Sequence, residues 1–242
     1  MLVKKKKRQP TMKKLSLLMC VLLGTSAIAM ASACPVSTYD NYMVSGFGCT
    51  IDDKTFSNFS YASSASGGAA LIPPSGVAVV PVTTLHNPGF LFSSGFGVIS
   101  NQTQDEFFGF TVRVNSGGNA IDDITLLQLG TGFIGTGSAS IAETVCLGDT
   151  FADGCLHGTI ASLLTVDNST LVKLSDHITF APVRVIDVVK DLELFGGPSG
   201  SAFVSGVENQ FSEVPEPSSL LMFGTGIVGV AGILRRKLNK LL

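Results

Sequence analysis

Apolar and polar residues alternate along the middle of this chain. Between Phe108 and Val114, apolar side chains occupy every second position, and Gly, Thr and Arg lie between them. This two-residue period is typical of a half-buried β-strand, since successive side chains of a strand point to opposite faces of the sheet. Related strand patterns cover residues 77–82, 90–98, 124–129, 160–166, 171–174 and 183–194.

Turn-forming residues separate these segments. Examples are Pro73-Pro74, Pro88-Gly89, Asp153-Gly154 and the glycine-rich stretch 196–198. Glycine and proline supply the backbone angles of tight turns, so they mark the ends of strands. No segment of the middle shows a convincing helical period, and only 14% of the residues are charged, which argues against a helical bundle. The sequence predicts an all-β exported domain, a β-sandwich of jelly-roll or immunoglobulin-like type.

Charge is distributed unevenly along the chain. The formal net charge is −2, but residues 34–213 hold five Lys and Arg against 17 Asp and Glu, a net charge of −12. Most of the positive charges lie near the two ends. A strongly acidic domain repels phosphate backbones, so nucleic acid is excluded as a partner, and solubility is the simpler explanation for the acidic residues.

The N-terminus has the features of an export signal. Lys13 and Lys14 precede the apolar run 15–29, and small residues follow at Ala31 and Ala33. This order predicts a signal peptide over residues 1–33 with cleavage after Ala33. Translation starting at Met1 and translation starting at Met12 both fit the pattern. Lipoprotein processing at Cys34 is disfavoured, because lipoprotein signals carry Leu three residues before the cysteine, whereas this chain has Ala31 there.

Cysteine spacing predicts a disulfide framework. Cys20 leaves with the signal, and four cysteines remain, an even number that favours disulfides in an exported domain. Three pairings are possible, and the shortest separations favour one bond near the start of the domain and one in its second half. Zinc is disfavoured, because there is no Cys-x-x-Cys and the histidines do not cluster. The favoured pairs are Cys34 with Cys49 and Cys146 with Cys155.

A proline-containing motif precedes an apolar run at the end of the chain. The run, residues 218–234, is about 25 Å long as a helix, which is just enough to span a bilayer core. The basic cluster after it predicts a stop-transfer signal, and the basic end 235–242 is expected to stay in the cytoplasm. The motif consists of Val214, Pro215, Glu216 and Pro217, and the basic cluster of Arg235, Arg236 and Lys237.

This tail, residues 212–242, resembles the PEP-CTERM sorting domain of Gram-negative bacteria that make exopolysaccharide. The resemblance implies that an exosortase-type membrane enzyme recognises the tail and cuts it near the triplet. Pro215 and Pro217 give a physical reason, since each fixes φ and removes a backbone donor, which keeps the chain extended before the helix. The middle, residues 34–211, more loosely resembles exported domains that precede such tails, and that resemblance implies no activity.

Few residues suggest chemistry. Asp149 and Asp153 lie between two cysteines and are weak calcium candidates, although the EF-hand spacing is absent and a polar hairpin tip is the simpler interpretation. The neighbouring carboxyls Asp52 and Asp53 are expected on opposite faces of a strand, where they could not act as an acid and base pair. The sequence therefore predicts no catalytic residue and no cofactor.

Two functions remain. The first is a non-enzymatic structural or adhesive module at the cell surface or in the extracellular matrix, associated with exopolysaccharide. The alternative is a secreted carbohydrate-binding domain or hydrolase acting on exopolysaccharide, which the absence of Trp and the presence of only three Tyr weaken. In both cases the protein is expected to cross the inner membrane, to be anchored transiently by its C-terminal helix, and to reach the surface or the medium.

Overall fold

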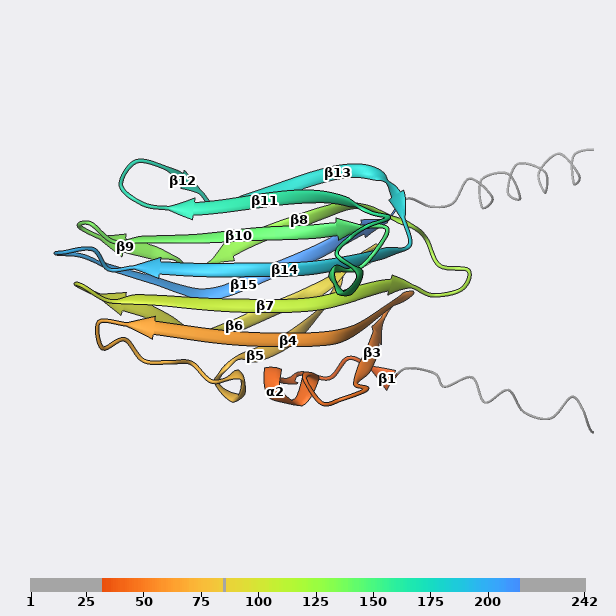
Figure 1. The fold of residues 1–242 in the computed structure, drawn as a ribbon, viewed down its shortest axis with the longest axis horizontal. Coiled ribbons are helices and arrows are strands. Elements are labelled where there is room, and N and C mark those ends of the chain that lie inside the picture. Colours follow the sequence, from red (N-terminus) through yellow and green to blue (C-terminus); the bar gives the residue numbers. More distant parts are fainter. Residues whose placement is uncertain (1–31, 85, 214–242) are drawn as a thin grey trace, which may run out of the picture. The chain divides into compact units, whose positions relative to one another are not determined.

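The computed structural model describes residues 32–84 and 86–213 as two β-sheets packed face to face (Figure 1). The predicted sorting motif, the transmembrane helix 218–234, the basic end and nearly all of the signal peptide lie outside these residues. Within the described part of the chain, no helix has the length and apolarity needed to cross a membrane.

The first sheet has eight strands. All pair antiparallel except β1 and β3, which run parallel. In spatial order they are β1 (Ser32–Ala33), β3 (Gly48–Ile51), β4 (Lys54–Ser66), β7 (Thr103–Val114), β14 (Val185–Phe195), β10 (Ser138–Leu147), β11 (Thr159–Asp167) and β12 (Val172–Lys173).

The second sheet has seven strands, all paired antiparallel. Three short helices connect strands of the sandwich. The strands are, in spatial order, β13 (Ser175–Val183), β8 (Ile121–Leu129), β15 (Ser201–Glu213), β6 (Asn87–Ile99), β5 (Ala78–Thr84) and β2 (Ser37–Thr38), with β9 (Gly132–Ile134) paired to β15. The helices are α2 (Tyr39–Tyr42), η1 (Pro74–Gly76) and η2 (Phe151–Asp153).

The alternation in the sequence places the core. Along β14, every second residue from Ile186 to Leu194 is buried, and the residues that alternate with them face outward. The same alternation recurs in β8 and β10, so each sheet turns one apolar face toward the other. The all-β sandwich prediction is confirmed.

Aromatic rings fill much of the space between the sheets. Phe92 of β6 stacks on Phe108 of β7 with ring centroids 5.4 Å apart, and Phe59 of β4 stacks on Phe110 at 5.8 Å. Tyr39 of α2 is fully buried among these rings and donates its hydroxyl to the carbonyl of Gly109 at 3.0 Å. Phenylalanine thus supplies the large side chains of a core that contains no tryptophan.

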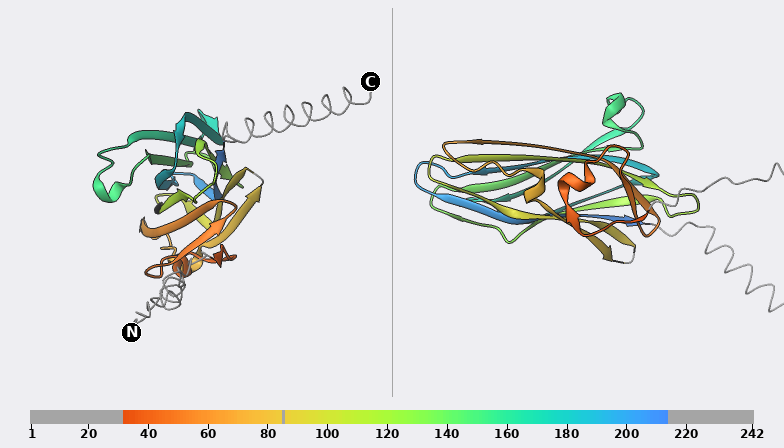
Figure 2. Two further views of the ribbon diagram at one scale, coloured as in Figure 1. Left: turned by 90° about the vertical axis from the view of Figure 1, so that its right-hand side faces the viewer. Right: turned by 90° about the horizontal axis from the view of Figure 1, so that it is seen from below.

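Both predicted disulfides form. Cys34 bonds Cys49 with Cα atoms 4.7 Å apart, and Cys146 bonds Cys155 with Cα atoms 5.8 Å apart. The first joins the chain before β2 to β3, and the second closes the segment between β10 and β11. That segment stands out from the outer face of the first sheet (Figure 2).

Candidate functional site

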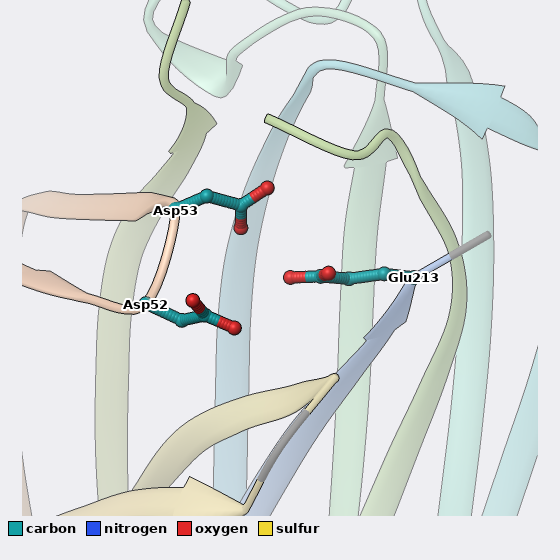
Figure 3. A group of neighbouring side chains, drawn as sticks. All are labelled: Asp52, Asp53 and Glu213. Atoms are coloured by element: carbon teal, nitrogen blue, oxygen red, sulfur yellow. The ribbon is translucent and has the colours of Figure 1, made fainter. Parts of the chain in front are cut away.

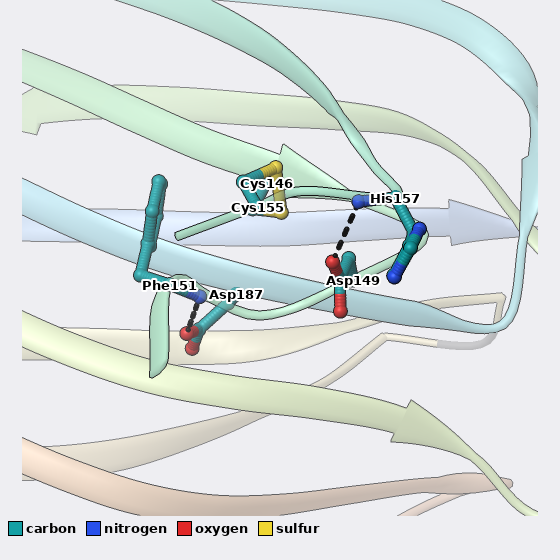
Figure 4. The surroundings of a disulfide bond; sticks show 6 residues. All are labelled: Cys146, Asp149, Phe151, Cys155, His157 and Asp187. Atoms are coloured by element: carbon teal, nitrogen blue, oxygen red, sulfur yellow. Dashed lines mark hydrogen bonds between the residues drawn. A yellow bond between two sulfur atoms is a disulfide. The ribbon is translucent and has the colours of Figure 1, made fainter. Parts of the chain in front are cut away.

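A groove runs between the disulfide-closed segment and the outer face of the first sheet. Its volume is about 510 Å³. The floor comes from β4, β7 and β14, and η2 forms one wall (Figure 4). The polar and aromatic groups that line it include Asn58, Ser60, Thr111, Arg113, Phe151 and Asp187.

A chain of hydrogen bonds crosses the groove floor. Asn58 Nδ2 donates to Thr111 Oγ1 at 3.1 Å, and Thr111 Oγ1 donates to Asp187 Oδ1 at 2.8 Å. The other carboxylate oxygen of Asp187 accepts the backbone N–H of Phe151 at 2.9 Å (Figure 4). Asp187 therefore ties the sheet to the overlying segment, and three strands and one loop are held in a fixed relation.

Local backbone geometry positions the floor. The register of β4 against β7 shifts between Ser57 and Ser60, a β-bulge, and Asn58 in this bulge has φ of 57°. Asparagine tolerates this left-handed conformation better than most residues, and the bulge redirects its side chain. At Gly109, a Cβ atom would lie 2.3 Å from Ser60 Oγ, so a side chain there would crowd the floor.

The overlying segment is held by its own contacts as well as by the disulfide. Asp149 accepts the backbone N–H of His157 at 3.0 Å (Figure 4), and hydrogen bonds from this backbone lower the pKa of the Asp149 carboxyl. Gly154 and Cys155 adopt positive φ, which reverses the chain. Asp149, one of the weak calcium candidates, thus accepts a hydrogen bond from the loop backbone, which fits a polar hairpin tip. Asp153, the other candidate, is exposed.

A second polar cluster lies at one end of the sandwich. Asp52, Asp53 and Glu213 bring carboxylate oxygens within 4.8 Å of one another (Figure 3). The expectation that Asp52 and Asp53 occupy opposite faces of a strand is wrong, because both lie in the turn between β3 and β4, where Asp52 has φ of 54°. A turn lets adjacent side chains converge on the end of β15.

The ammonium of Lys54 already pairs with two of these three carboxylates. Its Nζ donates to Asp53, to Glu213 Oε1 at 2.6 Å and to the carbonyl of Asn119 at 2.9 Å. Burial opposes ionisation of Asp53, but hydrogen bonds with Glu213, Lys54 and the Asn119 backbone outweigh it and lower the pKa of its carboxyl. The cluster is therefore an internal ion-pair network, in which a metal ion would have to compete with Lys54.

The carboxyls of Asp191 and Glu106 have raised pKa values. Burial and the nearby Asp105 raise the pKa of Asp191, on the outer face of the first sheet, to about 7. Burial raises the pKa of Glu106 to about 7, although its carboxylate accepts hydrogen bonds from Tyr61 and from Ser63 Oγ. Both groups bind protons more tightly in the folded chain than in the unfolded chain.

Stability is consequently expected to fall as pH rises from 5 to 8. The folded state binds more protons than the unfolded state between the ordinary carboxyl pKa and about 7, so the free energy of unfolding decreases through that interval. We expect a loss of about 1 to 2 kcal/mol after allowance for solvent screening of Asp191, or roughly 2 to 4 °C in Tm per kcal/mol. Thermal melts of wild type and of Asp191→Asn with Glu106→Gln would test this, and the double variant should show a flatter profile.

The sequence identified part of this arrangement. The disulfide that closes the segment over the groove was predicted, but the floor residues Asn58, Thr111 and Asp187 were not. These residues come from three strands that are distant in the sequence, and none belongs to a linear motif. The predicted sorting residues 214–217 and stop-transfer residues 235–237 lie outside the described residues.

Residues 213–237 match the family of the PEP-CTERM protein-sorting motif. The chain therefore carries this sorting motif, as the sequence predicted, which is consistent with a substrate of exosortase and with export and cell-surface sorting. A comparison with curated proteins found no match.

Solved structures with partial similarity include carbohydrate-binding modules. TmCBM61 in complex with β-1,4-galactotriose has 14% identity and a TM-score of 0.32, covering 63% of this chain and 88% of its own. The family 11 module from Clostridium thermocellum, in complex with a mixed-linked tetrasaccharide, has 12% identity and a TM-score of 0.23, covering 64% and 90%. The CBM22-1 xylan-binding domain of Paenibacillus barcinonensis Xyn10C has 11% identity and a TM-score of 0.24, covering 76% and 99%. At such TM-scores these similarities do not bear on the ligand of this chain.

Proposed function

We propose that this protein is an exported, non-enzymatic adhesive module that the PEP-CTERM tail delivers to the cell surface, where its sandwich binds a neutral exopolysaccharide in the groove over the first sheet. The observation that carries the proposal is the row of polar groups from Asn58 through Thr111 to Asp187, in a groove whose lining also includes Phe151.

The groove has the two kinds of groups that sugars need. Sugar hydroxyls both donate and accept hydrogen bonds, and Asp187, Asn58 and Arg113 offer acceptors and donors in the lining of one groove. Phe151 is half-buried in the wall and offers an apolar ring against which the C–H face of a sugar can pack. The hydrogen bonds of Asp187 hold these groups in place before the ligand arrives, which lowers the ordering cost of binding.

The carboxyl groups of the groove favour binding over hydrolysis. Most glycosidases place two carboxyls on either side of the scissile bond, about 5 to 10 Å apart. Among the described residues that line this groove, Asp187 is the only one with a carboxyl group, and both of its oxygens are engaged by Thr111 and Phe151. The acidic charge of the domain favours a neutral glycan over an anionic one.

Binding is tested by calorimetry of the purified exported protein with neutral and anionic exopolysaccharide fractions. We expect Phe151→Ala to weaken binding of the neutral fraction by at least about tenfold, equivalent to about 1.4 kcal/mol, because it removes the ring from the wall. Phe203→Ala is the matched control, since Phe203 is 51% exposed on β15 of the other sheet. Binding that is absent from every fraction, or equally strong in both variants, would refute the proposal.

A further inference from the structure

Three polar side chains lie in the centre of the core between the two sheets. Glu143 of β10 and Lys190 of β14 are direct cross-strand partners in the first sheet, and Asn209 belongs to β15 of the second. Their exposed fractions are 1%, 0% and 0%. Such groups are rarely buried together without a reason, because an apolar core gives them no water to replace lost hydrogen bonds.

Glu143 contacts both of the other side chains. Its Oε2 lies 3.3 Å from Lys190 Nζ, and its Oε1 accepts a hydrogen bond from Asn209 Nδ2 at 3.2 Å. Asn209 Nδ2 also donates to the carbonyl of Thr125 at 3.2 Å, which orients the carboxamide. One carboxyl group therefore holds an amine from one sheet and a carboxamide from the other.

This cluster is incompletely satisfied as a set of hydrogen bonds. Lys190 Nζ and Asn209 Oδ1 both lack a hydrogen-bond partner among the described residues. The amine instead faces aromatic rings, 4.5 Å from the centroid of Phe110 and 5.8 Å from that of Phe92. A buried pair that served only stability would be expected to satisfy its polar atoms, or to be replaced by apolar residues of similar volume.

The apolar surroundings also favour the uncharged forms of the pair. Burial lowers the pKa of the Lys190 amine and raises the pKa of the Glu143 carboxyl, although each group attracts the charge of the other. A neutral amine is a nucleophile, and a protonated carboxyl is a general acid. The aromatic rings exclude water, which would otherwise compete with the amine for the carboxamide carbon.

We infer that Lys190 and Asn209 form an intramolecular amide bond that links the two sheets, with Glu143 as the residue that moves the protons. Lys190 transfers a proton to Glu143, and the neutral Nζ attacks Asn209 Cγ. Glu143 gives that proton to the departing nitrogen and takes up the proton that Nζ loses as the amide forms. The Cγ–Nδ2 bond breaks, ammonia leaves, and Glu143 ends protonated. The net change is one new C–N bond, one broken C–N bond and the release of one ammonia, and no oxidant is needed.

The bond would connect the last two long strands of the sandwich. β14 lies in the middle of the first sheet and β15 in the middle of the second, so the amide would cross the core where the sheets face each other (Figure 1). It would prevent the two sheets from separating, in addition to the disulfides, which act near one edge and in one loop. This inference does not depend on the identity of the ligand of the groove.

Mass spectrometry of the mature exported protein, purified from its cells and reduced, tests this inference. We expect the intact mass to be about 17 Da lower than the mass of the processed sequence, since one ammonia is lost. Proteolysis and tandem mass spectrometry should find the peptide containing Lys190 joined to the peptide containing Asn209. Glu143→Gln and Lys190→Met should abolish both signals, and Lys173→Met should retain them, because Lys173 lies on the surface.

A succinimide at another asparagine would also remove ammonia, and the variants separate the two cases. A deficit that persists in Lys190→Met, or that is found without the joined peptides, would contradict the inference. So would wild-type protein of full mass with both peptides unlinked. Since the decisive measurement is made on wild type, the inference stays testable even if the core variants fold poorly.

Discussion

Lys54→Met will lower the free energy of unfolding by about 3 to 5 kcal/mol. The side chain of Lys54 is fully buried, and its Nζ contacts Asp53, Glu213 and the carbonyl of Asn119. Methionine preserves most of the volume but removes the charge, which leaves the carboxylate of Glu213 buried to 1% exposure without its cation. Leaving one member of a buried ion pair uncompensated is among the most destabilising of single changes.

Urea denaturation of the oxidised protein measures this effect. The matched control is Lys173→Met, which removes a lysine that is 44% exposed and paired with Asp176 at 2.8 Å, and we expect a loss of less than about 1 kcal/mol there. Adding Glu213→Gln to Lys54→Met should recover part of the loss, because it removes the orphaned charge. Equal losses from the two lysine variants would contradict the network.

Lys54 also holds the last residue of the sandwich in place, next to the start of the sorting motif. Glu213 is the last residue of β15 and the first residue of the matched motif at 213–237. The ion pair therefore anchors the final strand immediately before the segment that the processing enzyme is expected to recognise. Cleavage near residues 214–217 would leave this pair within the exported product.

The sequence predicted strands well where large apolar residues alternate. The segments 108–114 and 124–129 correspond to β7 and β8, because their buried positions carry Phe, Val, Ile or Leu. Strands β4 and β13 were not predicted, and neither were β10 and β15. Their inward positions include Ala139, Glu143 and Asn209, whose small or polar side chains conceal the two-residue period.

The candidate site could be predicted only where it depended on spacing. The two disulfides followed from the number and separation of the cysteines, and the sorting motif from a contiguous pattern. The groove depends on a bulge at Asn58 and on strands paired over long distances in the sequence, and strand order does not follow from alternation. The cluster of Lys190, Glu143 and Asn209 was missed for the same reason, since the register that joins them is a property of the folded sheets.

Phe90→Ala is expected to cost about 3 to 5 kcal/mol, because the aromatic rings of the core depend on one another. Phe90 is fully buried, and its ring centroid lies 4.8 Å from that of Phe56 and 5.6 Å from that of Tyr42. Alanine would remove these contacts and leave a cavity that the surrounding strands, fixed by their pairing, can only partly fill.

Phe107→Ala is the control for this change, since Phe107 lies on the outer face of β7 and is 39% exposed. We expect it to cost less than Phe90→Ala, because 39% of its surface already lies in water and its removal opens no enclosed cavity between the sheets. Chemical denaturation with the disulfides intact compares the two variants under one reference state. Similar losses at both positions would mean that the packing between the sheets contributes less than these contacts indicate, and that the disulfides or the cross-sheet amide carry more of the stability.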